Sequence, residues 1–221
     1  IASGMYIARM DADDVSIKDR FKLQLGQFNN NPNLLVVGSD VFYLRKNKKH
    51  YGISPKEPYS IQWNLLTKQT GLHHPTVMFK RKEVIENYGG YPEKFPYSQD
   101  RALWLKISFA EPKALFNMNK PLLIYRRTKS SIGMRDKNLD KKIASNLFFI
   151  TPYINEMINA KIDEDEFLTL IYHKFKSLGV TLRSLVILRT LFRNYKNKHD
   201  ITSSDFSYIK KNYRHLSRRL V

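Results

Sequence analysis

The chain has 221 residues, of which 42% are hydrophobic and 13% aromatic, which suits one medium-sized folded domain or a domain with an appendage and excludes a disordered polymer. It has no cysteine, so disulfides and thiolate metal sites are excluded as well. The 38 Lys and Arg residues outnumber the 20 Asp and Glu, giving a formal net charge of +18. Such an excess indicates a polyanionic partner: nucleic acid, anionic lipid or a phosphorylated substrate.

An acidic turn follows the first predicted element, a short buried strand over residues 4–10. Asp11, Asp13 and Asp14 bring three carboxylates together, and a cation relieves their mutual repulsion. Oxygen-only ligands favour Mg²⁺ or Mn²⁺, which takes one or two carboxylates and completes its shell with water and substrate phosphates. A solvated acidic turn that caps the next helix is the alternative interpretation.

The middle of the chain alternates helices and strands, as in an α/β fold. The predicted elements are a helix over about 17–29 capped by Ser16, a strand over 34–44, a basic turn over 45–49, a helix over 59–70, a strand over 76–80 and a helix over 82–88 ended by Gly89 and Gly90. Regular secondary structure is expected to be interrupted at His73, His74 and Pro75, before the strand over 76–80. Paired histidines can bind metal, phosphate or a sugar, and a purely structural role is the alternative.

A second carboxylate site is predicted at the start of a helix. Ser98 is expected to cap this helix, with Asp100 in its first turn. The helix dipole favours the ionised form of Asp100, and a carboxylate that is ready to accept a proton is what an incoming hydroxyl group needs. The alternative is a carboxylate that only complements the helix dipole.

Two adjacent arginines follow the last predicted strands, which are expected over 114–116 and 122–125. Arg126 and Arg127 have the planar guanidinium groups that suit a diphosphate. A solvated strand end is the alternative.

Together these segments resemble family 2 glycosyltransferases of the GT-A fold, in an order and spacing that agree over about residues 1–128. The family's metal-binding strand and following helix are matched by Tyr6–Asp14 with Asp19-Arg20-Phe21 and Gln24, and its next strand by Val36–Ser39. Its acceptor-side strand is matched by His74–Arg81. The segment with the catalytic base is matched by Gly89–Phe95 with Gln99–Leu105, and the closing strand by Tyr125-Arg126-Arg127.

The resemblance implies a role for each matching residue. Asp11 and Asp13 would meet the nucleotide sugar, and Asp13 and Asp14 would hold the metal, Mn²⁺ or Mg²⁺. Asp100 would be the general base of an inverting transfer, beside Gln99, where many family members have an acid. The implied substrate-binding set also includes His74, Gln99, Arg126 and Arg127.

Nothing in this chain matches what the family places before the metal-binding strand: an opening strand, a Pro-x-Tyr/Phe-Asn-like turn and an acidic residue for the nucleobase. We therefore expect an α/β fold, with an incomplete GT-A (Rossmann-like) glycosyltransferase domain over residues 1–128 and a basic α-helical extension over residues 129–221. As a fragment, a truncated reading frame or half of a split enzyme, such a chain is expected to bind a nucleotide sugar poorly by itself.

The extension has the pattern of a basic amphipathic helix over residues 182–194. One side carries Leu185, Ile187, Leu188, Leu191 and Phe192, and the other carries Arg183, Arg189 and Arg193. This pattern is found in peripheral membrane anchors, so we expect the helix to bind an anionic membrane surface. The alternative is that its apolar side packs on the domain.

The resemblance and the basic helix together imply a cytoplasmic, hexosyltransferase-like enzyme, peripheral on the inner face of the membrane. It would transfer a sugar from a UDP-linked nucleotide-sugar donor to a saccharide or lipid-linked acceptor in cell-surface polysaccharide synthesis. Two alternatives stay open: a nucleic-acid-binding module that uses the basic tail, and a catalytically inactive truncated transferase. Nucleic acid is disfavoured because the chain has no zinc finger, RNP-like run or basic heptad repeat.

Overall fold

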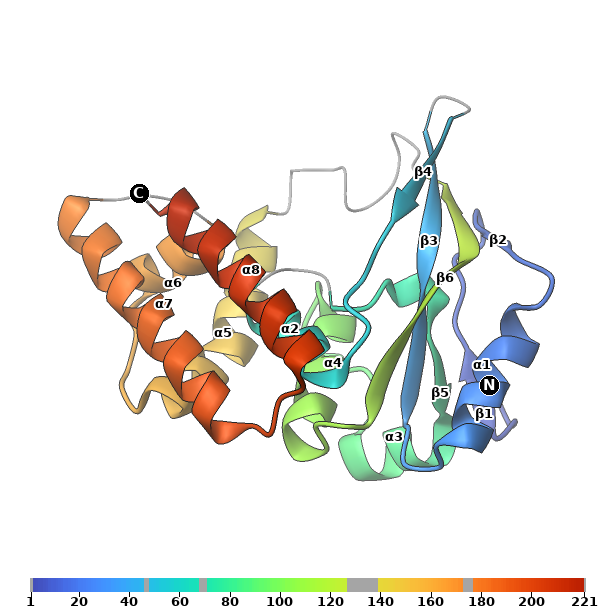
Figure 1. The fold of residues 1–221 in the computed structure, drawn as a ribbon. Helices are drawn as coiled ribbons and strands as arrows, with labels where there is room; N and C mark the ends of the chain where they lie inside the picture. The colour runs from blue at the N-terminus through green and yellow to red at the C-terminus, as the bar shows by residue number, and fades with distance from the viewer. Residues whose placement is uncertain (1, 46–47, 68–70, 127–138, 173–176, 221) are drawn as a thin grey trace.

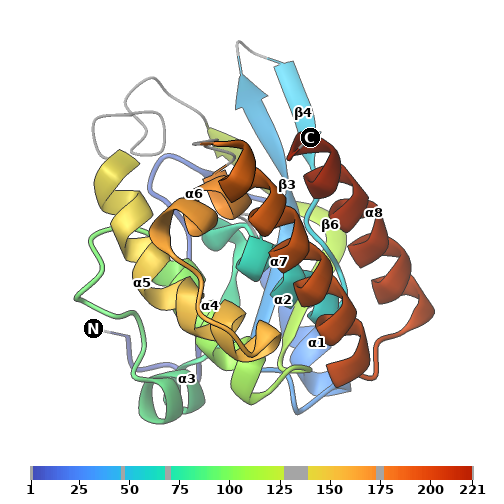
Figure 2. The ribbon, with the colours of Figure 1, turned by 90° about the vertical axis from the view of Figure 1, so that its left-hand side faces the viewer.

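The computed structural model describes residues 2–45, 48–67, 71–126, 139–172 and 177–220. Within these ranges, a mixed β-sheet with helices on its faces is followed by four helices that stack beside it (Figures 1 and 2). The predicted α/β fold with an α-helical C-terminal part is therefore confirmed.

The sheet brings the ends of three strands to one edge. Its strands are β1 (Tyr6–Ala8), β2 (Val15–Ser16), β3 (Val36–Arg45), β4 (Lys48–Gly52), β5 (Met78–Lys80) and β6 (Leu115–Arg126). They lie in the order β1-β5-β3-β6-β2, with β4 also paired to β3. β3 and β6 are parallel, and β1 and β3 are both antiparallel to β5. β1, β3 and β6 therefore point the same way, and their C-terminal ends meet at one edge.

Helices cover both faces of this sheet. The helices of the first part are α1 (Arg20–Asn30), α2 (Pro58–Thr67), the 3₁₀ helix η1 (His74–Thr76), α3 (Arg81–Tyr88) and α4 (Gln99–Ala110). Successive residues of a strand point to opposite faces: Val36 joins the large core that includes α2 and α4, whereas Val37 joins a smaller cluster with Phe28 of α1.

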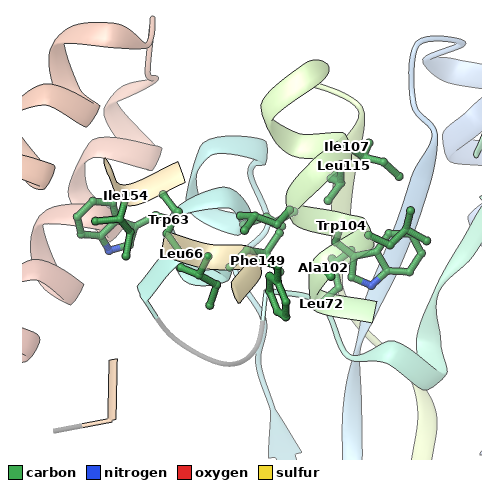
Figure 3. Packing of buried hydrophobic residues seen from close by; sticks show 14 of the residues in the cluster. Trp63, Leu66, Leu72, Ala102, Trp104, Ile107, Leu115, Phe149 and Ile154 are labelled. Atoms are coloured by element: carbon green, nitrogen blue, oxygen red, sulfur yellow. The ribbon is translucent and has the colours of Figure 1, made fainter. Parts of the chain in front are cut away.

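The C-terminal helices share the large core with the sheet. They are α5 (Leu139–Ile158), α6 (Glu164–Tyr172), α7 (Leu178–Lys198) and α8 (Ser203–Arg219). Trp104 of α4 lies on the sheet side of this core, and Trp63 of α2 lies near Ile154 of α5 (Figure 3). The ring of Trp63 also lies 5.2 Å from that of Tyr195 in α7. One continuous core therefore joins both parts, and the boundary expected near residue 128 lies outside the described residues.

Several predicted elements differ in detail from the structure. Ser16 does not cap α1; it lies in β2, a strand the sequence analysis missed, and α1 starts at Arg20. Of the basic turn expected over 45–49, Arg45 ends β3 and Lys48 begins β4, which pairs with β3 as a hairpin, and residues 46–47 lie outside the described residues. The two short strands expected over 114–125 are one strand, β6, because its pairing with β3 continues past an irregularity near Asp40.

Two predicted helix boundaries depend on backbone conformation. Gly89 ends α3 at a φ of 79°, where the chain is left-handed, as predicted. Ser98 precedes α4, but with a φ of 60° and no side-chain hydrogen bond to the helix, so it occupies the cap position without acting as a side-chain cap.

The apolar face of the basic helix is covered by the protein itself. Leu188 and Leu191 are fully buried, and Leu185, Ile187 and Phe192 pack against the large core. A face that is already buried cannot also enter a bilayer, so the interpretation of this face as a membrane-inserting surface is wrong. Among the described helices, none is long and apolar enough to cross a membrane.

Candidate active site

The acidic turn lies where β1 leaves the sheet, beside the end of β6. The Asp14 backbone N–H donates to the carbonyl of Asp11 at 3.2 Å, which closes a tight turn. Asp14 is only 7% exposed; its Oδ1 accepts the backbone N–H of Arg126 at 3.0 Å, and its Oδ2 is buried without a hydrogen-bond partner. Burial raises the pKa of Asp14, and the charges of Asp11 and Asp13 add to the rise.

Arg9, which the sequence analysis did not select, lies within this site. Its Nη2 is 2.6 Å from Oδ1 of Asp11, and its Nη1 is buried without a hydrogen-bond partner. The positive charge of Arg9 acts on the pKa values of Asp14, His74 and Tyr91. Arg9 therefore pairs with the acidic turn and also interacts electrostatically with the group around Asp100.

Asp100 faces the side chain of His74. The two atoms that approach, Asp100 Oδ2 and His74 Nδ1, are 3.9 Å apart, which is too long for a direct hydrogen bond. On the other side of the ring, His74 Nε2 lies 3.0 Å from the hydroxyl of Tyr91. The sequence segments that supply these residues are thus brought together by the fold.

The protonation of this group follows from its burial. Burial lowers the pKa of His74 in spite of the nearby Asp100 charge, so the ring is neutral near pH 7. Burial also raises the pKa of Tyr91, so its hydroxyl keeps its proton. We infer that the Tyr91 hydroxyl donates to Nε2, which leaves the imidazole proton on Nδ1, toward Asp100.

The acidic turn and the Asp100 group interact electrostatically. The negative charge of Asp11 acts on His74 together with that of Asp100. Lys142, in the first turn of α5, interacts electrostatically with Asp100: burial lowers the pKa of Lys142, the charge of Arg101 adds to that shift, and the Asp100 charge opposes it. The C-terminal helices therefore contribute a basic residue within electrostatic range of Asp100.

Two buried side chains of α1 hold the site's backbone in place. Arg20 is fully buried and donates to the carbonyls of Arg9 at 2.6 Å and Val77 at 3.3 Å. Its Nε donates to Oε1 of Gln24 at 3.0 Å, and Gln24 in turn donates to the carbonyls of Val37 and Thr76. This pair ties α1 to the strand before the acidic turn, to β3 and to η1.

The remaining predicted residues are less closely engaged. Asp13 is exposed, and Gln99 is half-buried at the first position of α4. Arg126 supplies its backbone N–H to Asp14 while its own side chain is exposed. Arg127 lies outside the described residues.

A divalent cation suits part of this arrangement. No three His, Asp or Glu side chains gather as a metal site among the described residues. Mg²⁺ and Mn²⁺ need only one or two carboxylates when substrate phosphates complete the shell. Asp14 offers a buried Oδ2 with no partner, and its pKa is raised in part by repulsion from Asp11 and Asp13, which a cation would offset. The residues therefore fit an ion held by Asp13 and Asp14.

Comparison with known proteins points to glycosyltransferases. No model of a known protein family matches the chain. The chain is 29% identical over 173 residues to the Escherichia coli O-antigen biosynthesis glycosyltransferase WbnJ, covering 78% of this chain and 64% of that protein. It is 32% identical over 101 residues to the Escherichia coli UDP-Gal:alpha-D-GlcNAc-diphosphoundecaprenol beta-1,3-galactosyltransferase, covering 45% of this chain and 36% of that protein.

The chain spans about half the length of the curated relatives it matches, for instance 54% of an uncharacterized Haemophilus influenzae glycosyltransferase. Among solved structures, Staphylococcus aureus TarS in complex with UDP-GlcNAc matches with a TM-score of 0.49 and 12% identity, over 98% of this chain and 68% of that one. A likeness this loose carries no argument about ligands. The sequence relatives support a glycosyltransferase.

Proposed function

We propose that this chain is the acceptor-side part of an inverting, metal-dependent family 2 glycosyltransferase of the GT-A fold. The observation that carries the proposal is the placement of Asp100 and His74 within electrostatic range of the acidic turn Asp11–Asp14. The names of the relatives add the reaction class, and one of them names UDP-galactose as donor and a diphosphoundecaprenol-linked sugar as acceptor. A UDP-sugar donor and a saccharide or lipid-linked acceptor follow for this chain.

The reaction needs a base on the acceptor side. As the acceptor oxygen forms its bond to the anomeric carbon, its proton moves to a carboxylate oxygen of Asp100. The bond between that carbon and the donor diphosphate breaks, and its electron pair leaves with the nucleoside diphosphate. Attack opposite the leaving group inverts the anomeric carbon. His74, with its proton on Nδ1, is available to hold a sugar hydroxyl beside Asp100.

The acidic turn serves the donor side. Mn²⁺ or Mg²⁺ bound by Asp13 and Asp14 would neutralise the negative charge that develops on the departing diphosphate. Asp11, paired with Arg9, is positioned to accept hydrogen bonds from the hydroxyls of the donor sugar. Arg9 also offers its buried, unpartnered Nη1 to an anionic or hydroxyl oxygen.

The cellular setting is part of the proposal. The name of one relative includes O-antigen biosynthesis, which favours a role in cell-surface polysaccharide synthesis. A lipid-linked acceptor would bring the enzyme to the cytoplasmic face of a membrane. The basic outer surface of the C-terminal helices would then face anionic lipid.

The product's stereochemistry tests the proposed reaction. The protein that contains these residues would be incubated with Mn²⁺, saccharide acceptors and either UDP-galactose or UDP-N-acetylglucosamine. In both donors the sugar is α-linked to the diphosphate. Proton NMR of the new linkage should show the large anomeric coupling of a β-glycoside. An α-linked product would contradict an inverting transfer, and turnover that is unchanged in excess chelator would contradict the metal.

A further inference from the structure

A pocket lies away from the candidate active site. Its volume is about 440 Å³, and it is formed by the C-terminal end of α1, the starts of α2 and β6, and the connection from α7 to α8. A volume in this range suits a small organic ligand. The polar side chains at its wall are Gln27, Asn30, Asn31, Glu57, Tyr59, Lys113, Asp200, Thr202 and Asp205.

The pocket opens near the opposite edge of the sheet from the acidic turn. Phe116, at its wall, is the second residue of β6, whereas Arg126, which contacts Asp14, is the last. Ten strand residues at about 3.3 Å each separate the two sites by roughly 30 Å. A ligand in this pocket would therefore not occupy the donor position.

The charges at the wall nearly balance. Glu57, Asp200 and Asp205 line the pocket together with Lys113, and Lys56 pairs with Glu57 at 3.5 Å and lies over the ring of Phe116. Without an excess of positive charge, the wall does not favour the phosphates of a nucleotide or lipid headgroup. Asp205 is already held by the backbone N–H of Ser60 at 2.7 Å, so it acts as a fixed acceptor, not as a mobile counter-ion.

Several polar groups at the wall have bonding capacity to spare. The side chains of Gln27 and Asn30 make no hydrogen bond among the described residues, and neither does the hydroxyl of Tyr59. Burial raises the pKa of Tyr59, and the charges of Asp200 and Asp205 add to the rise, so this hydroxyl stays protonated beside two carboxylates. Both donors and acceptors thus line the pocket.

Apolar surfaces complete the wall. The ring of Phe116 and the side chains of Leu34, Pro58 and Ile201 also line the pocket. A pyranose ring presents hydroxyls that both donate and accept at its rim and C–H groups on its faces. Amides, a phenol and carboxylates around an aromatic ring match that distribution.

We propose that this pocket binds a neutral saccharide, a unit of the acceptor or product chain distant from the reacting end. The source of the saccharide rests on the proposed function, but its binding does not require transfer. By holding one part of a glycan roughly 30 Å from the acidic turn, the pocket would favour extended oligosaccharides over single sugars.

Saturation-transfer NMR on the 221-residue chain tests the pocket directly. The probes are lactose, cellobiose and N,N′-diacetylchitobiose at millimolar concentration, without donor or metal. Asn30→Ala and Asp200→Ala alter exposed residues of the wall, and each should weaken binding about tenfold, as expected for one lost hydrogen-bonding group. Asn29→Ala is the matched control, because Asn29 is exposed on the same helix but outside the pocket, and it should bind as the parent does.

A further variant distinguishes this pocket from the active site. His74→Ala, on the proposed acceptor side of the active site, should bind the disaccharide as the parent does, and UDP with Mn²⁺ should not displace it. If His74→Ala abolishes the signal, if no probe binds, or if spermidine binds in their place, the pocket is not a neutral-saccharide site. Saccharide binding that persists in a protein unable to transfer sugar would contradict the proposed function and leave this inference standing.

Discussion

Replacing Arg20 is expected to loosen the acidic turn and the His74 segment together. Its guanidinium is fully buried and is the donor to the carbonyls of Arg9 and Val77 and to Oε1 of Gln24. In Arg20→Met the Arg9 carbonyl and Oε1 of Gln24 lose this donor, whereas the Val77 carbonyl keeps the backbone N–H of Arg9 at 2.9 Å. Each buried group left unpaired costs about 1–3 kcal/mol. Allowing for water that enters the space, we expect the free energy of unfolding to fall by about 3–5 kcal/mol.

Urea unfolding followed by tryptophan fluorescence measures this loss. Arg20→Lys keeps the charge but not the planar fork of donors, so its loss should be intermediate. Arg189→Met, on the exposed side of α7, is the control and should change stability by no more than about 0.5 kcal/mol. The reasoning is refuted if Arg20→Met costs less than about 1 kcal/mol or no more than the control.

Three further predictions concern the acidic turn, the core and the surface. The pKa of Asp14 is raised above 3.8 in the folded protein, so the folded state binds this proton more tightly than the unfolded state does. The free energy of unfolding therefore falls as the pH rises from 3.8 through the folded pKa of Asp14. Asp14→Asn should remove that slope in urea titrations, and Mn²⁺ should stabilise the parent but not the variant at neutral pH; identical slopes would contradict this. Leu188→Ala should cost about 2–5 kcal/mol of stability, whereas Val186→Ala, at a residue 65% exposed on the same helix, should cost little, and equal effects would mean that Leu188 is not in the core. A basic groove of about 500 Å³ on α8 is lined by Lys210, Lys211 and Arg214. Changing all three to Gln should weaken binding to anionic vesicles, measured by co-sedimentation, by about 1 kcal/mol per charge. Unchanged sedimentation would exclude this surface as the membrane contact.

Elements bounded by residues with a strong conformational preference were predicted from the sequence. Gly89 marks the end of α3 because its left-handed conformation suits glycine, and the acidic turn does follow a strand. β2 was missed because Val15 and Ser16 form a strand only through pairing with β6, and no pattern exists in two residues. β4 was missed because its basic, exposed residues do not alternate between apolar and polar.

The candidate site required tertiary information. Asp11, His74 and Asp100 are far apart in the chain, and only the order of the family-like segments indicated that they share a site. Arg9 and Lys142 could not be picked out from the sequence, because a single basic residue is typical of a solvent-exposed surface. The helical wheel correctly found the apolar face around Leu188, but a wheel cannot tell whether protein or lipid covers such a face.

The turnover of Asp100→Asn tests the central claim most directly. Asparagine keeps the shape of the side chain but cannot take the acceptor's proton. In the protein that contains these residues, kcat for transfer from the UDP-sugar should fall by about 10²–10⁴-fold, while donor binding measured by calorimetry stays as in the parent. Glu164→Gln, the corresponding carboxylate-to-amide change at an exposed first-turn residue of α6, should leave both kcat and donor binding unchanged. If Asp100→Asn turns over as fast as the Glu164→Gln control, Asp100 is not the base, and the account of this site as a glycosyl-transfer centre is contradicted.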